Sequence, residues 1–271
     1  MRSIFAQSEQ HWELIVVCDG APDILVTRLL QITDKRVKVI VHHENRGLPF
    51  RLNEIANTAE AEYLARMDSD DVMHPERLAT QLAYLESHPT VDVLGSASFL
   101  MTETNVLSGR YREPALPNRS AGYLQSGVFS HPTVIFKTAW AVSNPYESSW
   151  VRTEDKELWL RTSSHSTFEK IAAPLLYCRV PLDLSVPKQA LTAKWDRRLI
   201  RRFGPPNSSR IHVATLIAKS HLKQRLFQFA CVIGLSRRVH SRKASPLDNV
   251  SQRIAEADLD IALSTSVPGW D

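Results

Sequence analysis

The stretch "EYLARMDSDDVMHPERLATQLAYLESHPTVDVLGS", residues 62–96, contains a strand, an acidic turn, a helix and a second strand in close succession. Residues 62–68 and 91–96 are short, β-rich segments. Residues 75–88 show the apolar spacing of a helix, which Pro75 opens at its first turn. Strands that alternate with helices of this length predict βαβ units and a parallel sheet.

The same alternation precedes this stretch, with strands expected at 13–18 and 37–43 and helices at 24–32 and 49–61. The pattern after it is less regular. We expect strands at 105–114, 131–137 and 166–180 and helices at 138–143 and 153–164. From residue 188 to 243 the chain becomes helical and basic, and the last 28 residues predict little structure. The expected organisation is an α/β domain over 1–187, a basic helical extension over 188–243 and a weakly structured tail over 244–271.

Composition excludes several classes of protein. Apolar residues make up 43% of the 271 residues and charged residues 23%, which is typical of a soluble globular protein. The three cysteines, Cys18, Cys178 and Cys231, are far apart, which argues against a disulfide framework or a zinc ribbon. No apolar run reaches 18 residues, and the N-terminus lacks the apolar core of a secretory signal, so the expected location is the cytoplasm.

Charge is distributed unevenly along the chain. Residues 1–187 carry a net charge of −5 and residues 188–271 one of +9, and Asp196 is the only acid between 188 and 243. One interpretation of this basic amphipathic pattern is peripheral contact with the anionic inner face of a membrane. The other is a solvated basic face packed on the main domain. Because no helix-turn-helix, zinc or RNP signature accompanies the charge, we expect no nucleic-acid partner.

Polar residues follow each of the first three predicted strands. Asp19 follows the first, Asn45-Arg46-Gly47 the second and Asp68 to Asp71 the third. Ligands of parallel α/β sheets bind beyond the carboxyl ends of the strands, so these three loops predict one binding site.

The acidic turn has the chemistry of a metal site. Mg²⁺ and Mn²⁺ prefer oxygen ligands and are commonly held by one or two carboxylates together with substrate phosphates. Asp70 would be the direct ligand and Asp68 a second or water-mediated one. The alternative is that these acids only complement the dipole of the helix that follows, as Asp71 and Glu76 would.

Five segments, taken in order, resemble the family 2 glycosyltransferases, which are inverting enzymes of bacterial surface-polysaccharide synthesis. The resemblance covers roughly residues 3–180 and implies the GT-A fold, a Rossmann-like mixed α/β sheet that binds nucleotide-diphospho-sugars. The segments are "SIFAQSEQHWELIVVCDGAPD" (3–23), "NRGLPFRLNEIANTAEAEYLARMDSDD" (45–71), "HPERLATQLAYLESHPTVDVLGS" (74–96), "HPTVIFK" (131–137) and "TEDKELWLR" (153–161).

The resemblance implies a role for each matching residue. Asp19, with Asn45, would contact the nucleotide, and Asp68 and Asp70 would hold Mn²⁺ or Mg²⁺ against the diphosphate, near His131. Asp155 would be the catalytic base, with Glu154 and Trp159 on the acceptor side. From the residues alone, Glu154 and Asp155 could equally complement a helix dipole, Trp159 could be ordinary core, and His131 a structural histidine.

The implied reaction moves a sugar from a nucleotide donor, most often UDP-linked, to a hydroxyl of a glycan or lipid-linked acceptor. Such transfer needs a base and no covalent enzyme intermediate, which fits the absence of a nucleophile motif such as GxSxG.

Two features depart from the family pattern. Cys18 replaces one of a pair of acids, and the apolar first strand, normally central in the sheet, is missing. A start placed too far downstream, a truncated gene, or closure of the gap by neighbouring strands would each explain the second departure. The competing hypothesis is therefore a non-catalytic remnant or scaffold.

Overall fold

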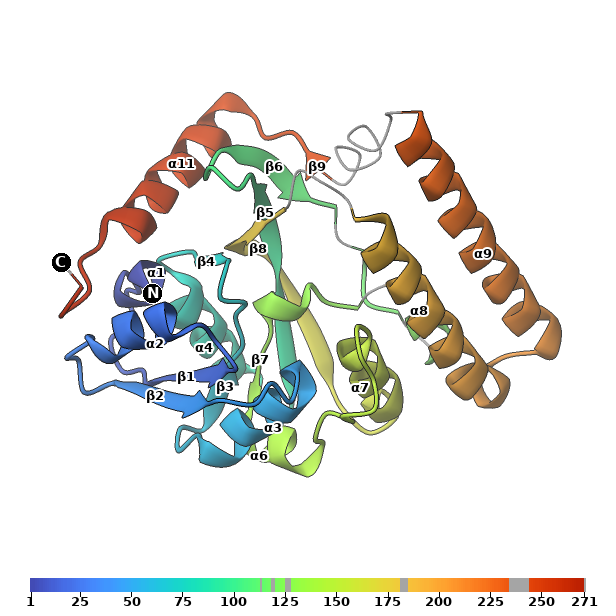
Figure 1. Ribbon diagram of the computed structural model, residues 1–271, viewed down its shortest axis with the longest axis horizontal. Coiled ribbons are helices and arrows are strands. Elements are labelled where there is room, and N and C mark those ends of the chain that lie inside the picture. The colour runs from blue at the N-terminus through green and yellow to red at the C-terminus, as the bar shows by residue number, and fades with distance from the viewer. Residues whose placement is uncertain (113, 118–119, 125–127, 181–184, 234–243, 271) are drawn as a thin grey trace.

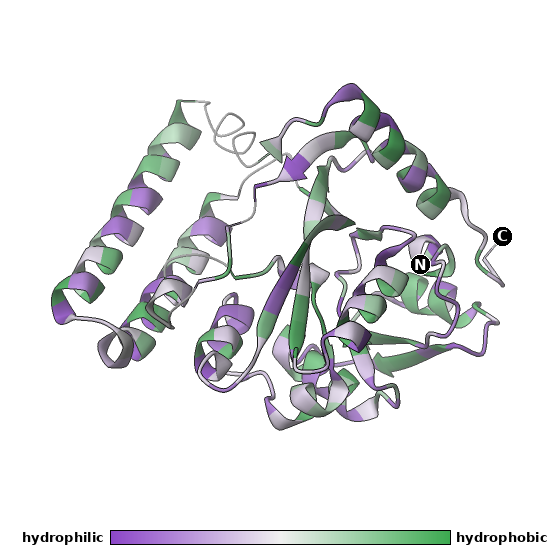
Figure 2. Cartoon of the chain, turned by 180° about the vertical axis from the view of Figure 1, so that it is seen from behind, coloured by the Kyte–Doolittle hydropathy of each residue, from purple (hydrophilic) through white to green (hydrophobic). Residues whose placement is uncertain are grey.

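The computed structural model describes residues 1–271 except 113, 118–119, 125–127, 181–184, 234–243 and 271. Helices surround two β-sheets, and two long helices, α8 (Val186–Asn207) and α9 (Arg210–Val232), lie side by side at one end of the molecule (Figure 1). Figure 2 shows apolar residues concentrated along the central strand, whereas polar and apolar residues alternate along the long helices.

The first βαβ unit forms as predicted. Strands β1 (Leu14–Asp19) and β2 (Val37–His42) pair in parallel, from Leu14 opposite Val37 to Asp19 opposite His42. Helix α2 (Asp23–Leu30) connects them, and α3 (Leu48–Thr58) follows β2. The carboxyl ends of β1 and β2 therefore lie together, next to the start of α3.

The second sheet has seven strands and is mixed. Strand β5 lies at its centre with every residue buried, parallel to β8 and antiparallel to β6 and β7. The prediction of an all-parallel sheet is wrong here, because β5–β8 is the one parallel pair of this sheet in the described chain. The mixed α/β sheet implied by the resemblance is confirmed. The strands are β3 (Tyr63–Ala65), β4 (Val72–Met73), β5 (Val93–Met101), β6 (Leu107–Tyr111), β7 (Ile135–Lys137), β8 (Phe168–Arg179) and β9 (Ala244–Ser245).

Strand pairing does not join the two sheets. Within the described residues β1 pairs with β2 alone and β3 with β7 alone, so neighbouring strands do not close the gap that the sequence left open. Apolar side chains from the two sheets contact one another instead. Leu14 and Ala65 pack in one cluster with the buried Ile4, Met73 and Leu78.

The main apolar core lies between β5, β7 and the helices that carry the predicted site. Helix α7 (Glu154–Thr162) contributes Leu158 and Trp159, and α8 buries Leu199 and Ile200 against the same cluster. The apolar face of α8 is thus used for packing on the domain. Other helices before α7 in the described chain are α1 (Arg2–Phe5), α4 (Arg77–Ser87), α5 (Ser120–Tyr123), η1 (His131–Thr133) and α6 (Thr138–Ser143).

The prediction of a weakly structured C-terminal tail is wrong. Helix α11 (Asn249–Ser264) begins at Asp248, whose carboxylate accepts hydrogen bonds from the backbone N–H groups of Val250 and Ser251. It packs on the mixed sheet, and the buried Tyr177 hydroxyl donates to the carbonyl of Ala255 at 2.8 Å. Its buried face consists of Ala255, Leu259 and Ala262, while other apolar residues are exposed. That arrangement weakens the apolar periodicity on which a sequence-based prediction depends.

Candidate functional site

Asp19, at the end of β1, forms hydrogen bonds with the loop that follows β2. Its carboxylate accepts hydrogen bonds from the backbone N–H of Arg46 at 2.9 Å, the N–H of Gly47 at 2.8 Å and Nε of Arg51 at 2.6 Å. Gly47 has φ +88°, a conformation that favours glycine, and it precedes α3 directly. Burial raises the pKa of Asp19, but these hydrogen bonds outweigh it and hold the pKa below its ordinary value.

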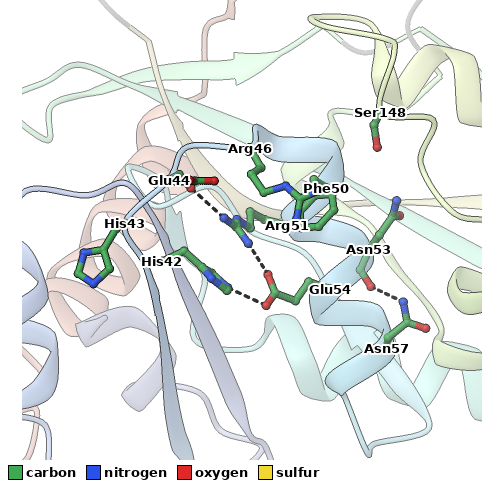
Figure 3. Close-up of a pocket in the computed structure, with 10 residues that line it drawn as sticks. All are labelled: His42, His43, Glu44, Arg46, Phe50, Arg51, Asn53, Glu54, Asn57 and Ser148. Carbon is green, nitrogen blue, oxygen red and sulfur yellow. Dashed lines mark hydrogen bonds and ion pairs between the residues drawn. The ribbon is translucent and has the colours of Figure 1, made fainter.

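A cavity of about 770 Å³ opens beside this loop (Figure 3). Arg51 lies at its floor and donates to Glu54 at 3.0 Å and to the carbonyl of Glu44 at 2.9 Å. The guanidinium of Arg46 lies 3.5 Å from the centre of the Phe50 ring. The cavity therefore offers cations and an aromatic face, next to the predicted nucleotide contacts Asp19 and Asn45. Its lining consists of His42, His43, Glu44, Arg46, Phe50, Arg51, Asn53, Glu54, Asn57 and Ser148.

The acidic turn brings three carboxylates together between β3 and β4. Oxygen atoms of Asp68, Asp70 and Asp71 all lie within 4.8 Å of one another. Asp71 accepts from the backbone N–H of Arg179 at 2.8 Å. The first turn of α4 carries no acid, so the helix-dipole interpretation of Asp71 is wrong. Burial, reinforced by the charges of Asp68 and Asp70, raises the pKa of Asp71 to about 7.

The donor set of this turn fits a hard divalent cation. It supplies carboxylate oxygens only, from three residues whose oxygen atoms lie within 4.8 Å of one another. Asp70 is exposed, whereas Asp68 is half-buried and ion-paired with Arg66 at 2.5 Å. The residues that would hold the ion are thus Asp70 and Asp68, with Asp71 behind them.

Arg66 is a site residue that the sequence analysis missed. Its side chain is 6% exposed, and Nη1 has no hydrogen-bond partner among the described residues. Burial raises the pKa of Asp71, Glu154 and Asp155, and the positive charge of Arg66 offsets a small part of that rise at each of them. The charge of Arg66 therefore acts on both the acidic turn and the start of α7. The available signal was an arginine inside the apolar run directly before Asp68.

The start of α7 places two further acids in a partly buried setting. Burial raises the pKa of Asp155 and of Glu154, and one Glu154 carboxylate oxygen is buried without a hydrogen-bond partner in the described chain. Thr153 precedes the helix as expected, but its hydroxyl makes no capping hydrogen bond. A buried carboxylate with a raised pKa has the property that a general base needs.

His131 and Tyr146 extend this group. His131 Nε2 and the Tyr146 hydroxyl are 2.8 Å apart. Burial, with a contribution from the charge of Arg66, lowers the pKa of His131 well below its ordinary value, so the ring is neutral near pH 7. Burial also raises the pKa of Tyr146, and the charges of Asp155 and Glu154 add to that effect. The charge of Arg66 thus acts on His131, Glu154, Asp155 and Asp71, and its guanidinium is ion-paired with Asp68. Asp19 and Asn45 belong to the separate network beside the first cavity.

Trp159 lies beneath the site rather than at its surface. The side chain has no exposed area, and its ring lies 5.2 Å from Phe129 and 6.2 Å from His131, measured between centroids. It therefore has no surface with which to contact an acceptor, which agrees with the core interpretation left open by the sequence.

The model of the family described as "Glycosyl transferase family 2" matches residues 1–140, slightly more than half of the chain. The chain belongs to glycosyl transferase family 2. It is similar to the bifunctional glycosyltransferase pgtA of Dictyostelium discoideum, with 46% identity over 99 residues. That match covers 34% of this chain and 13% of pgtA.

A second relative is WfgD of Escherichia coli, named a UDP-Glc:alpha-D-GlcNAc-diphosphoundecaprenol beta-1,3-glucosyltransferase. It is 23% identical over 158 residues, which cover 58% of this chain and 60% of WfgD. The chain thus spans less than two thirds of the length of each of these two relatives. Among solved structures, residues 1–349 of TarS from S. aureus superpose with a TM-score of 0.52 at 19% identity, covering 97% of this chain and 75% of that one. This likeness concerns the fold, which is that of the family 2 glycosyltransferases.

Proposed function

We propose that this family 2 glycosyltransferase transfers a sugar, with inversion, from a nucleotide-diphosphate donor to a hydroxyl of a glycan or lipid-linked acceptor during cell-surface polysaccharide synthesis. The observation that carries the proposal is the acidic turn of a family 2 chain, in which three carboxylates lie within 4.8 Å of one another beside the buried Arg66. The donor nucleotide is UDP, as it is for WfgD by name. The proposed location is the cytoplasm, at the inner face of the membrane.

Asp155 is the base of the proposed reaction. The acceptor oxygen attacks the anomeric carbon as its proton passes to the Asp155 carboxylate. The bond from that carbon to the diphosphate breaks on the opposite face, and the nucleoside diphosphate leaves with the bonding electrons. Asp68 and Asp70 would hold Mn²⁺ or Mg²⁺, which when bound stabilises the charge of the diphosphate as a Lewis acid. Asp19 and Asn45 orient the nucleotide, and the neutral His131 donates a hydrogen bond to the diphosphate.

Isothermal titration calorimetry with UDP, with and without Mn²⁺, tests the donor site. We expect binding that depends on Mn²⁺, because a divalent ion removes the repulsion between the diphosphate and the three carboxylates. If UDP binds under neither condition, the competing hypothesis of a non-catalytic scaffold is favoured.

The membrane contact is assigned to α9 rather than α8, since α8 packs its apolar face on the domain. Leu222, Leu226 and Phe229 are 58, 59 and 62% exposed along α9, beside the exposed Arg225. No described helix is both long and apolar enough to span a bilayer. An apolar stripe with basic neighbours and no acids suits the surface of an anionic membrane.

Sedimentation with phosphatidylglycerol vesicles tests this contact. We expect the wild-type chain to sediment with the vesicles and Leu226→Ser/Phe229→Ser to remain largely in the supernatant. Val250→Ser/Ile254→Ser is the matched control, because these two apolar residues are equally exposed on α11. Equal sedimentation of all three proteins would contradict the membrane contact.

A further inference from the structure

A second cavity, of about 540 Å³, lies between α7, α8 and α9 and the edge formed by β6 and β8. Its described lining contains four lysines, which come from two helices and a β-strand, and one acid, Asp196. The lysines are Lys156 on α7, Lys170 on β8, and Lys219 and Lys223 on α9. Aromatic and aliphatic side chains, among them Tyr111 and Phe129, form the rest of the wall.

The cavity borders the candidate catalytic residues. Lys156 follows Asp155 directly on α7, and Ser130, which also lines the cavity, precedes His131. Ser130 Oγ lies 3.7 Å from Cys178 Sγ on β8, the strand that ends at Arg179 beside Asp71. Asp155 and His131 do not themselves line the cavity, but their sequence neighbours do, so the cavity adjoins the start of α7.

Two of the four lysines have partners among the described residues. Asp196 is paired with Lys156 at 2.7 Å, and Lys170 donates to the carbonyl of Pro114 at 3.2 Å. Lys219 and Lys223 lie one turn apart on α9, and neither ammonium group has a hydrogen-bond or ion-pair partner within the described part of the chain. Like charges that converge on one cavity repel each other unless an anion lies between them.

The helix that carries the exposed Lys219 and Lys223 is held in position by its packing. Arg197 on α8 donates to Gln224 at 2.9 Å, and Leu216 on α9 is buried in the main core. The lysines thus face α7 from a fixed helix rather than from a loose loop. Ammonium groups carried by a fixed helix bind phosphate as compact point charges. The volume suits a ligand larger than inorganic phosphate, such as a sugar phosphate.

We propose that this cavity binds a phosphate group of the acceptor, so that the acceptor substrate is a phosphorylated glycan. The inference rests on the proposed function, because it assumes that the neighbouring acids act on an acceptor hydroxyl. It adds a substrate class that the acidic turn and α7 do not themselves specify. The lysines select the phosphate, and the aromatic wall packs against the sugar that carries it.

Calorimetry with glucose 1-phosphate in EDTA tests the proposal without involving the acidic turn. We expect binding by the wild type and at least about a tenfold higher Kd for Lys219→Gln/Lys223→Gln, which loses two charge-assisted contacts. The matched control is Lys188→Gln/Lys194→Gln, which removes the same charge from exposed positions on α8 outside the cavity. The control should bind as the wild type does, and glucose itself should bind to none of the three proteins.

Three results would overturn the proposal. One is no binding of glucose 1-phosphate to the wild type, and another is equal weakening in the cavity variant and the control. The third is binding of soluble dihexanoyl phosphatidic acid but not of glucose 1-phosphate, which would identify the ligand as a lipid headgroup. UDP binding in Mn²⁺ is measured on the same proteins, so a failure of this proposal is distinguishable from a failure of the donor site.

Discussion

Replacing Asp155 by asparagine is expected to lower kcat of sugar transfer by about 10²- to 10⁴-fold, the usual contribution of a general base. Asparagine keeps the shape of the side chain but cannot take the acceptor proton. Binding of UDP in Mn²⁺ should be unchanged, because Asp155 acts on the acceptor. The assay measures UDP release from whichever UDP-sugar binds in calorimetry, with acceptor present.

The pH dependence gives a second readout of the same residue. Burial raises the pKa of Asp155, so the carboxylate keeps its proton to a higher pH than a surface aspartate does. The protonated form cannot act as a base, and kcat/KM should therefore fall as the pH falls through this raised pKa. Asp155→Asn should lose that acidic limb together with the activity.

Glu154→Gln is the informative control, since Glu154 is adjacent and its pKa is also raised by burial. A large loss in Glu154→Gln with near-normal activity in Asp155→Asn would transfer the role of base to Glu154. Normal activity in both variants would contradict a base at the start of α7.

Asp70→Ala is expected to raise the Kd for UDP in Mn²⁺ by about 100-fold or more, since changes even to groups that only support a metal ligand cost 10- to 100-fold in metal affinity. The substitution should not unfold the protein. The side chain of Asp70 is exposed, and Arg179 Nε binds its backbone carbonyl, which alanine retains. The measurement is calorimetry at matched Mn²⁺ concentrations.

Asp23→Ala is the control for Asp70→Ala, because it removes an exposed acid on α2 away from the turn. It should bind UDP as the wild type does. Unchanged Mn²⁺-dependent binding in Asp70→Ala would mean that the acidic turn does not hold the ion.

Local sequence was sufficient to predict most of the secondary structure. The strand that ends at Asp19, the helix after Thr153 and a helix within 75–88 are confirmed, because apolar spacing acts within a few residues. Pro75 is not in the first turn of that helix, which begins at Arg77. Strand direction in the second sheet was not predictable in this way. The position of β7 between β3 and β5 depends on pairing between residues about 40 and 70 positions apart along the chain.

The sequence by itself determined the family, the alternation of strands and helices, and the carboxylates at strand ends and at the start of α7, since these are properties of residue type and spacing. Only the tertiary structure decided what surrounds them. It buried Arg66 beside the acidic turn, placed Trp159 in the core, folded 249–264 onto the sheet and gathered four lysines around one cavity beside α7. The reason is physical: burial and charge at each of these positions come from side chains distant in sequence, and a local pattern contains no information about them.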